Sequence, residues 1–279
     1  MINFKQYTNL TDVVIPDAVQ ITNADFTNAF NNMQTLQYVR LPNRITNMYQ
    51  IFNNCQNIIG QSPVCNNQVT NMSNAYQYCR NLIGSPVCGE NVVNMSNAYR
   101  YCNNITGSPV CGEKVVDMRD AYSGCYNITG SPVCGNNVTN MYGTYFACRN
   151  LTGSPVCGDK VTDMSNTYNY CLNITGNPVC GNNVTNMAYT YCNCKNVKGD
   201  MYCYNPNITN FAGCFYNRRG AARINIYVPA NSITNNTIYQ GINNARTSIV
   251  GAATSWNVRY LSQNYYYHTT YNLYVYFTL

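Results

Sequence analysis

The segment Asn127–Gly158, NITGSPVCGNNVTNMYGTYFACRNLTGSPVCG, carries nearly the same sequence twice. The motif Gly-Ser-Pro-Val-Cys-Gly returns after 23 residues, and a second cysteine, Cys148, lies between the two copies. A fixed period of roughly 20 to 50 residues is typical of a solenoid, in which each repeat forms one coil and buries its apolar face only against its neighbours. The sequence therefore predicts a stack of 23-residue coils.

The same period orders cysteine, methionine and aromatic residues along most of the chain. The regular repeats span residues 55–217, residues 1–54 hold an N-terminal cap and the first repeats, and residues 218–279 hold a C-terminal cap and a strand-forming tail. The first cysteine series is Cys55, Cys79, Cys102, Cys125, Cys148, Cys171 and Cys194, and the second is Cys65, Cys88, Cys111, Cys134, Cys157, Cys180 and Cys203. The aromatic series is Phe52, Tyr76, Tyr99, Tyr122, Tyr145, Tyr168 and Tyr191.

One half of each coil has the spacing of a short helix. Met95, Ala98, Tyr99 and Cys102 stand at i, i+3, i+4 and i+7, which places them on one helix face. Asn94 precedes this group, and Asn or Asp holds the same position in the other repeats, where its side chain can cap the first free N–H groups.

The other half of each coil is predicted to be extended. Pro109 lacks an N–H group and disfavours a helical conformation for Ser108 before it. Proline is tolerated at the first position of a strand. We therefore expect a parallel strand of two to four residues at each Pro-Val-Cys, closed by a turn at glycine. The predicted fold class is a repeat solenoid with one short strand and one short helix per coil.

The early repeats carry a second pattern in the stretch Ala29–Cys55, AFNNMQTLQYVRLPNRITNMYQIFNNC. Its regular positions are Ala29, Phe30, Met33, Leu36, Val39, Leu41, Pro42, Ile45 and Met48. This pattern resembles the BspA-like leucine-rich repeat of bacterial surface proteins, with Met33 in place of that family's cysteine. The resemblance covers roughly residues 4–230. In the central repeats, proline precedes the strand and cysteine takes its last apolar position. The resemblance implies a stacked scaffold for recognition or assembly and implies no reaction.

Four interpretations of the sixteen cysteines compete. Buried thiols that pack as small apolar groups are the favoured one. Disulfides between coils would require Cβ atoms closer than stacked parallel chains allow. A zinc site requires closely spaced pairs, and Cys192-Asn193-Cys194 is the one close pair. A nucleophilic cysteine would need a base, and the one histidine is His268 in the tail. No metal site and no cofactor is predicted.

The C-terminal segment is expected to cap the stack. Ile224, Ile226, Val228 and Pro229 resemble the last strand of BspA-like arrays, and residues 238–250 with Trp256 could supply the capping helix. The tail then alternates apolar and polar side chains with the period of a strand. It is a candidate assembly segment for docking on another subunit, with a strand folded back within the same chain as the alternative. Its residues are Leu273, Tyr274, Val275, Tyr276, Phe277 and Leu279.

The repeats vary around the first cysteine, and stacking would align these positions into one stripe. The stripe is rich in Tyr, Arg and Asn, which suit recognition surfaces. An unconstrained solvent face is the alternative interpretation. The candidate recognition residues are Gln77, Tyr78, Arg80, Arg100, Tyr101, Asn103, Tyr126, Phe146, Arg149, Asn169 and Tyr170.

Composition limits the function classes. Charged residues form 9% of the chain, and the net charge of +6 comes from scattered Lys and Arg, which disfavours nucleic-acid binding. No apolar stretch reaches the roughly 18 residues of a membrane span. With ten carboxylates and one histidine, catalysis is not expected.

The remaining expectation is a structural or recognition protein of a virus particle, such as a bacteriophage fibre, spike or decoration protein that contacts other virion proteins or a host receptor or glycan as a homo-oligomer. The N-terminus MINFKQYTNLTDVV lacks the basic start and apolar core of a secretory signal. The alternative is a secreted or cell-surface bacterial adhesin that binds host protein or glycan.

Overall fold

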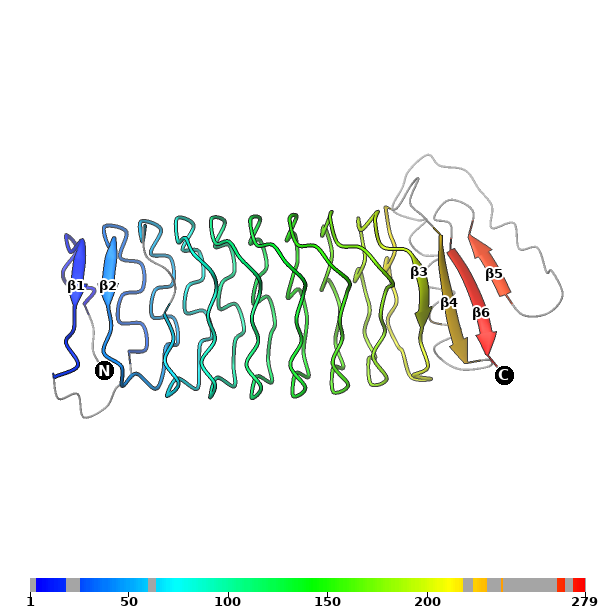
Figure 1. The fold of residues 1–279 in the computed structure, drawn as a ribbon, viewed down its shortest axis with the longest axis horizontal. Coiled ribbons are helices and arrows are strands. Elements are labelled where there is room, and N and C mark those ends of the chain that lie inside the picture. The colour runs from blue at the N-terminus through cyan, green and yellow to red at the C-terminus, as the bar shows by residue number, and fades with distance from the viewer. Residues whose placement is uncertain are drawn as a thin grey trace.

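In a computed structural model the chain forms an elongated stack of repeated coils (Figure 1). The structure describes residues 4–18, 26–59, 64–217, 223–229, 237, 265–268 and 273–278. Among the described residues, strands lie only at the two ends of the stack (Figure 1). At the N-terminal end β1 (Asp12–Val14) pairs in parallel with β2 (Tyr38–Arg40). At the other end, β3 (Gly199–Tyr202), β4 (Ile224–Pro229), β6 (Leu273–Thr278) and β5 (Tyr265–His268) form one sheet in that order. The prediction of a repeated stack with short parallel strands is confirmed.

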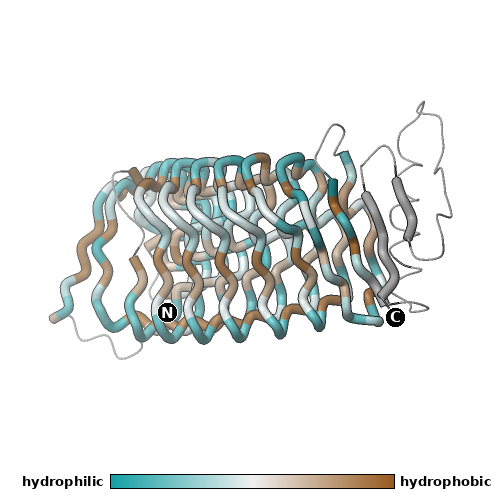
Figure 2. Tube along the Cα trace, turned by 45° about the vertical axis from the view of Figure 1, so that its right-hand side comes forward, coloured by the Kyte–Doolittle hydropathy of each residue, from teal (hydrophilic) through white to brown (hydrophobic). Residues whose placement is uncertain are grey.

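Apolar residues line up from coil to coil along the stack (Figure 2). The aromatic series forms one continuous column of stacked rings, with centroids of neighbouring rings 4.7 to 5.7 Å apart. It begins at Phe4 and Phe30, continues through the predicted series and ends at Phe215. The buried methionines and the first cysteine series form further columns beside it. The core therefore runs the length of the repeats.

The short helix predicted for each coil is wrong, because consecutive turns replace it. The N–H groups of Ala98 and Cys102 donate to the carbonyls three residues back, Met95 and Tyr99, and not to the fourth residue back as in a helix. The N–H groups of Met95 and Tyr99 themselves donate to carbonyls of the next coil, those of Asp117 and Ala121. A turn that repeats every four residues also places i, i+3, i+4 and i+7 on one side, so the burial pattern is that of a helix.

The Asn or Asp at the start of these turns caps them, as its position predicted for a helix. The side-chain oxygen of Asn94 accepts the N–H of Ser96 at 2.8 Å, a local bond that Asn and Asp favour in turns. The backbone of Asn94 also forms a parallel bridge to Asp117 of the next coil, and the same bridge continues along the stack. Each coil is thus joined to the next at its capped turn.

The strand predicted at Pro-Val-Cys is also wrong, because tyrosine hydroxyls take the place of a strand partner. The N–H of Val87 donates to the Tyr99 hydroxyl at 3.0 Å, and this hydroxyl donates to the Val87 carbonyl at 2.7 Å. The backbone groups of valine that could join a ladder are therefore bonded inside their own coil. The same pair of bonds joins Val64 to Tyr76, Val110 to Tyr122, Val133 to Tyr145, Val156 to Tyr168 and Val179 to Tyr191.

Phenylalanine replaces tyrosine in the column where the facing wall is a strand. Phe52 has no hydroxyl, and Arg40, twelve residues before it, lies in β2 and is paired with β1. Phe215 has none either, and Cys203, twelve residues before it, donates its N–H to the carbonyl of Tyr227 in β4. The backbone N–H and carbonyl groups of this wall are hydrogen-bonded by a tyrosine hydroxyl in the middle of the stack and by strand pairing at its ends.

The cysteines are free thiols that fill two kinds of site. In the first series the thiol is buried and donates to the carbonyl of the aromatic residue in the preceding coil, as Cys102 does to Tyr76 at 2.9 Å. In the second series the thiol is half-buried from Cys65 to Cys180, and from Cys65 to Cys157 it lies against a glycine of the next coil. A Cβ added at Gly112 would lie 3.1 Å from Sγ of Cys88 and 3.2 Å from the carbonyl oxygen of Gly89. The glycine that follows Pro-Val-Cys from Gly89 to Gly181 is therefore required for space.

Gly112→Ala should lower the free energy of unfolding by about 1 to 3 kcal/mol, the usual cost of overpacking. Cys88→Ala removes the sulfur atom that the new methyl group would meet. Urea denaturation of both single variants and of the double variant measures the coupling. The double variant should be less destabilised than the two single effects added together, and simple additivity would contradict the contact.

The tail closes the sheet of its own chain. β6 pairs in parallel with β4 on one edge and antiparallel with β5 on the other. Both edges of Leu273–Thr278 are therefore occupied within the chain, as the alternative of a strand folded back in the same chain predicts, and docking of the tail on another subunit stays a prediction. Leu279, the segment 238–250 and Trp256 lie outside the described residues.

Candidate recognition surface

One exposed corner of the stack carries tyrosines in an unusual backbone conformation. We call the position directly before each cysteine of the first series, together with the equivalent position Asn217 in the following coil, the corner slot. Its residues have positive φ angles in eight successive coils: Asn54 (59°), Tyr78 (62°), Tyr101 (59°), Gly124 (73°), Ala147 (58°), Tyr170 (62°), Asn193 (63°) and Asn217 (57°). Glycine and asparagine tolerate this left-handed region, whereas a bulky side chain there costs of the order of 1 kcal/mol. The tyrosines are therefore held at a cost in stability.

Two of these tyrosines form a stacked pair. The rings of Tyr78 and Tyr101 have centroids 5.1 Å apart and are inclined by 11°. The Tyr101 ring also extends over the next coil, where a Cβ added at Gly124 would lie 2.5 Å from its Cδ1 atom. Glycine therefore suits position 124 for two reasons: it tolerates the positive φ, and it has no Cβ to collide with the Tyr101 ring.

Arginines lie against the aromatic rings of this corner. The guanidinium of Arg100 lies 5.3 Å from the centroid of the Tyr101 ring, and that of Arg149 lies 5.1 Å from the Tyr126 ring. Arg100 is also held by Asn97, whose side-chain oxygen accepts at 3.2 Å, and by the carboxylate of Asp120 at 3.7 Å. Cation–π contacts at exposed sites contribute about 0.5 to 1 kcal/mol each, so they order the arginine side chains.

The structure places the other predicted residues on or beside this corner. Phe146 meets Tyr170 edge to face at 6.1 Å, and Arg80 is exposed. The Gln77 side chain accepts a hydrogen bond from Asn53 at 3.1 Å. Asn103, with its amide nitrogen turned toward them, donates to the carbonyls of Gly124 and Tyr101. These contacts make the corner an ordered surface.

Asn169 does not belong to the exposed surface. It is 7% exposed, and its amide donates to the Asn166 side chain at 3.0 Å. The prediction that it contributes to the recognition stripe is therefore wrong, because the coil turns its side chain inward between its neighbours.

Two exposed tyrosines were missed by the sequence prediction. Tyr189 has a φ of 55°, is 45% exposed and extends over Gly213 of the next coil, as Tyr101 extends over Gly124. Tyr142 is 41% exposed. The sequence did contain a signal for Tyr189, because other repeats carry Asn, Asp or Gly in the same position, such as Asn166 and Gly143.

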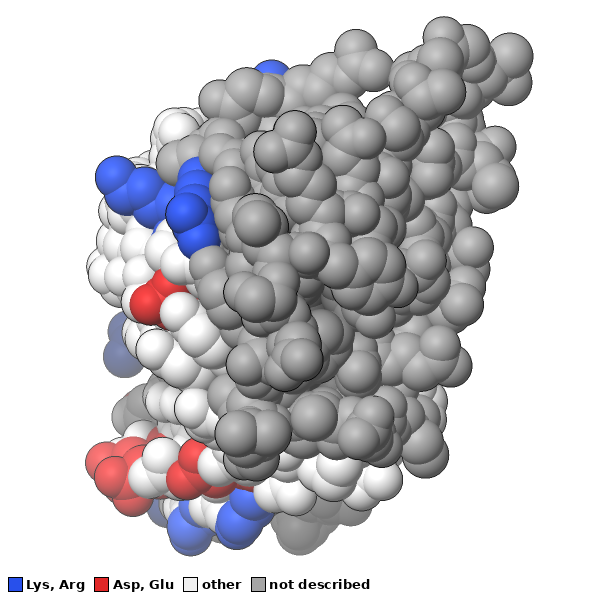
Figure 3. Space-filling view, turned by 90° about the vertical axis from the view of Figure 1, so that its right-hand side faces the viewer, with Lys and Arg blue, Asp and Glu red and all other residues white. Residues whose placement is uncertain are grey.

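The charge on the described surface is sparse. Seen from the C-terminal end, basic and acidic side chains occupy small separate groups on a largely uncharged surface (Figure 3). Among the described residues, no group of three or more His, Cys, Asp or Glu side chains is placed to hold a metal ion. No helix in the described part of the chain is long and apolar enough to cross a membrane.

The comparisons with known proteins give no family or relative. No protein-family model, no curated protein and no solved structure matches the chain. The structure alone therefore defines the class of this protein. It is a stack of repeated coils with an ordered surface of tyrosine, arginine and asparagine.

Tyr170→Asn should leave the thermal stability unchanged or raise the free energy of unfolding by up to about 1 kcal/mol. Asparagine is the residue that the same slot carries at Asn54, Asn193 and Asn217, and the Tyr170 side chain is 44% exposed, so little packing is lost. Thermal unfolding followed by calorimetry measures the change. A loss of more than about 1 kcal/mol would show that Tyr170 is there for packing and not for contact with a partner.

Proposed function

We propose that this protein is a non-catalytic scaffold that recognises a partner through its tyrosine and arginine corner. The observation that supports this most is the placement of Tyr78, Tyr101 and Tyr170 at positive φ, since strained residues that packing does not require are concentrated at functional sites. Tyrosine and arginine are also the residues that contribute most at protein interfaces. The stack beneath them holds the side chains in fixed positions.

Each coil is proposed to be a variant of the BspA-like leucine-rich repeat. The stretch Ala29–Cys55 supports this through its residue pattern, and β1 and β2 give that part of the chain the parallel strand pair of such a repeat. The central coils are then variants in which the tyrosine hydroxyl has replaced the strand pairing.

The proposed setting is a virus particle, in which the protein is a bacteriophage fibre, spike or decoration protein. Buried free thiols support assembly in a reducing host cytoplasm, because thiols in that compartment stay reduced. The partners would be other virion proteins or a host receptor or glycan, and assembly as a homo-oligomer is part of the proposal. β5 is the last strand of the C-terminal sheet and, within the described chain, pairs on one edge with β6, so its other edge could receive a second chain.

The alternative function is a secreted or surface adhesin that binds host protein or glycan. Mass spectrometry of purified virions and of the bacterial envelope distinguishes the two locations. Particles that contain the protein support the virion proposal, and its presence in the envelope alone would overturn that proposal.

The role of the corner is tested in the same system by adsorption to host cells. The double variant Tyr101→Asn and Tyr170→Asn should reduce adsorption at least tenfold without loss of folding. Val93→Thr is the matched control, because Val93 is 42% exposed in a position that Thr139 and Thr162 fill in other coils. Adsorption that is equal in the corner variant and the control would contradict the role of the corner.

A further inference from the structure

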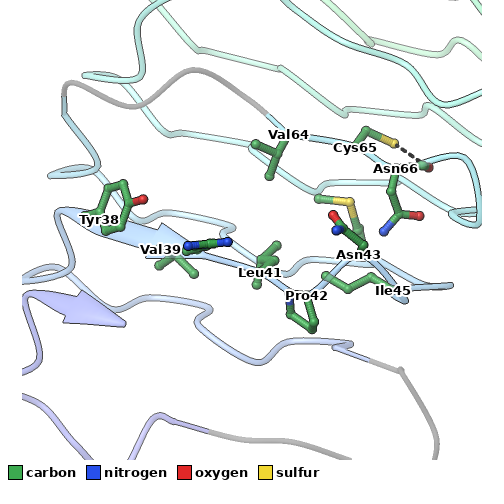
Figure 4. Close-up of a pocket in the computed structure, with 11 residues that line it drawn as sticks. Tyr38, Val39, Leu41, Pro42, Asn43, Ile45, Val64, Cys65 and Asn66 are labelled. Carbon is green, nitrogen blue, oxygen red and sulfur yellow. Dashed lines mark hydrogen bonds between the residues drawn. The ribbon is translucent and has the colours of Figure 1, made fainter. Parts of the chain in front are cut away.

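A hollow opens on the side of the stack near its N-terminal end. It has a volume of about 360 Å³ and lies between β2, with the residues that follow it, and the segment Val64–Asn66 of the next coil (Figure 4). Leu41 and Ile45 line it from the β2 side, and Val64 and Cys65 line it from the opposite side (Figure 4).

The hollow exists because two residues break the regular packing between coils. In the repeats from Cys65 onward, a glycine lies on the thiol of the preceding coil, as Gly112 lies on Cys88. Between the β2 coil and the next one, Leu41 takes the position of the thiol and Asn66 takes the position of the glycine. Leucine and asparagine side chains cannot nest in this way, so the two walls stay apart.

The floor of the hollow is apolar. Its apolar surface comes from Leu41, which is partly buried against the core, and from Val64, whereas Ile45 and Met48 beneath them are each 1% exposed and belong to the core. Val64 is 40% exposed, whereas the equivalent Val87 of the next coil is less exposed. A small ligand could cover this apolar surface. The volume of the hollow, about 360 Å³, lies at the lower end of the range of roughly 300 to 1,000 Å³ for ligand sites.

The rim carries one positive charge. Arg40 and Tyr38 lie two residues apart on β2, so their side chains project from the same face, and both are exposed. Neither of the two ion pairs found among the described residues involves Arg40. Among the described residues that line the hollow there is no carboxylate. A ligand that is apolar along its length and anionic at one end would match this arrangement.

We infer that the hollow beside β2 binds a small apolar carboxylate, with its hydrocarbon part on Leu41 and Val64 and its carboxylate on the Arg40 guanidinium. Arginine suits this role because its planar guanidinium can donate two parallel hydrogen bonds to one carboxylate. This inference is independent of the recognition role of the tyrosine corner.

Octanoate is the probe, and 1-octanol is its uncharged control. Titration followed by saturation-transfer NMR should show saturable octanoate binding at least tenfold tighter than that of 1-octanol. Arg40→Gln should weaken octanoate to the affinity of 1-octanol. Equal affinity of the two probes for the unchanged protein, or unchanged octanoate binding by the Arg40→Gln variant, would overturn the inference.

The position of the site is tested with the cysteines themselves. Octanoate should slow the alkylation of Cys65 by iodoacetamide at least threefold and leave Cys88 unaffected, because Cys88 holds the same position in a coil without the hollow. The double variant Leu41→Cys and Asn66→Gly restores the packing that the regular coils use and should abolish octanoate binding while the protein stays folded. Equal protection of Cys65 and Cys88, or binding that survives in the folded double variant, would overturn the proposed site.

Discussion

Raising the pH above 9 should unfold the protein within about two pH units. Burial raises the pKa of Cys79, Cys102, Cys125, Cys148 and Cys171 well above the ordinary value of 9.0, and each of these thiols is fully buried. Because the folded-state pKa is raised, the stability is fully present below pH 9.0. It is lost as the pH rises, since the unfolded chain then releases thiol protons that the folded chain retains.

The expected effect is large because the thiols act together. Each raised pKa lowers the free energy of unfolding by about 1.4 kcal/mol per pH unit above the unfolded value, so five fully buried thiols give about 7 kcal/mol per pH unit. Domains are typically stable by about 5 to 15 kcal/mol. Urea denaturation at several pH values between 8 and 10 measures the slope.

A matched pair of variants separates proton release from lost packing. Cys102→Ala with Cys125→Ala should reduce the slope by about 2.7 kcal/mol per pH unit. Val92→Ala with Val115→Ala removes buried groups that do not titrate, so this pair should lower stability but leave the slope unchanged. Equal slopes in the two double variants would contradict the origin assigned to the pH dependence.

Tyr99→Phe should lower the free energy of unfolding by about 2 to 4 kcal/mol, although it removes a single oxygen atom. The hydroxyl is both the acceptor for the Val87 N–H and the donor to the Val87 carbonyl. Its removal leaves two backbone groups without their partner, in a coil that has no strand pairing to replace it. Chemical denaturation of the purified variant measures the loss.

Tyr101→Phe is the control for this substitution. Tyr101 follows Tyr99 by two residues and lies at the exposed corner, and no hydrogen bond of its hydroxyl is found within the described chain. The change should stay within about 0.5 kcal/mol. Similar losses in the two variants would show that the hydroxyl of Tyr99 does not hold the wall of the coil.

The sequence was sufficient to predict the stacking and the core columns, because the 23-residue period requires equivalent residues to meet. It misled on local structure. Met95, Ala98, Tyr99 and Cys102 have helical spacing, but a chain of turns buries the same positions and also directs alternate N–H groups to the next coil. Spacing reports which side of the chain is buried and does not report where the hydrogen bonds go.

The prediction of a strand in the extended half of the coil was wrong for a related reason. The Pro-Val-Cys segment is extended in character, but whether it joins a strand ladder depends on a tyrosine twelve residues later in the chain. The variable positions around the first cysteine do lie together at the corner, and their role in recognition stays a prediction. The inward turn of Asn169 and the exposure of Tyr189 depend on neighbouring coils that a single repeat does not reveal.

The two ways of satisfying the coil wall also bear on how such a chain can change in evolution. The interior coils from Tyr99 to Tyr191 offer their neighbours the same tyrosine, thiol and glycine, so recombination that gains or loses one 23-residue unit among them would keep these contacts at each remaining junction. The ends differ, because Phe52 and Phe215 belong to coils closed by strands and cannot be exchanged for interior ones. Length is therefore the freely adjustable property of this protein: each unit gained would move the two ends apart by about 4.8 Å and add one more corner slot in which a new side chain can be tried.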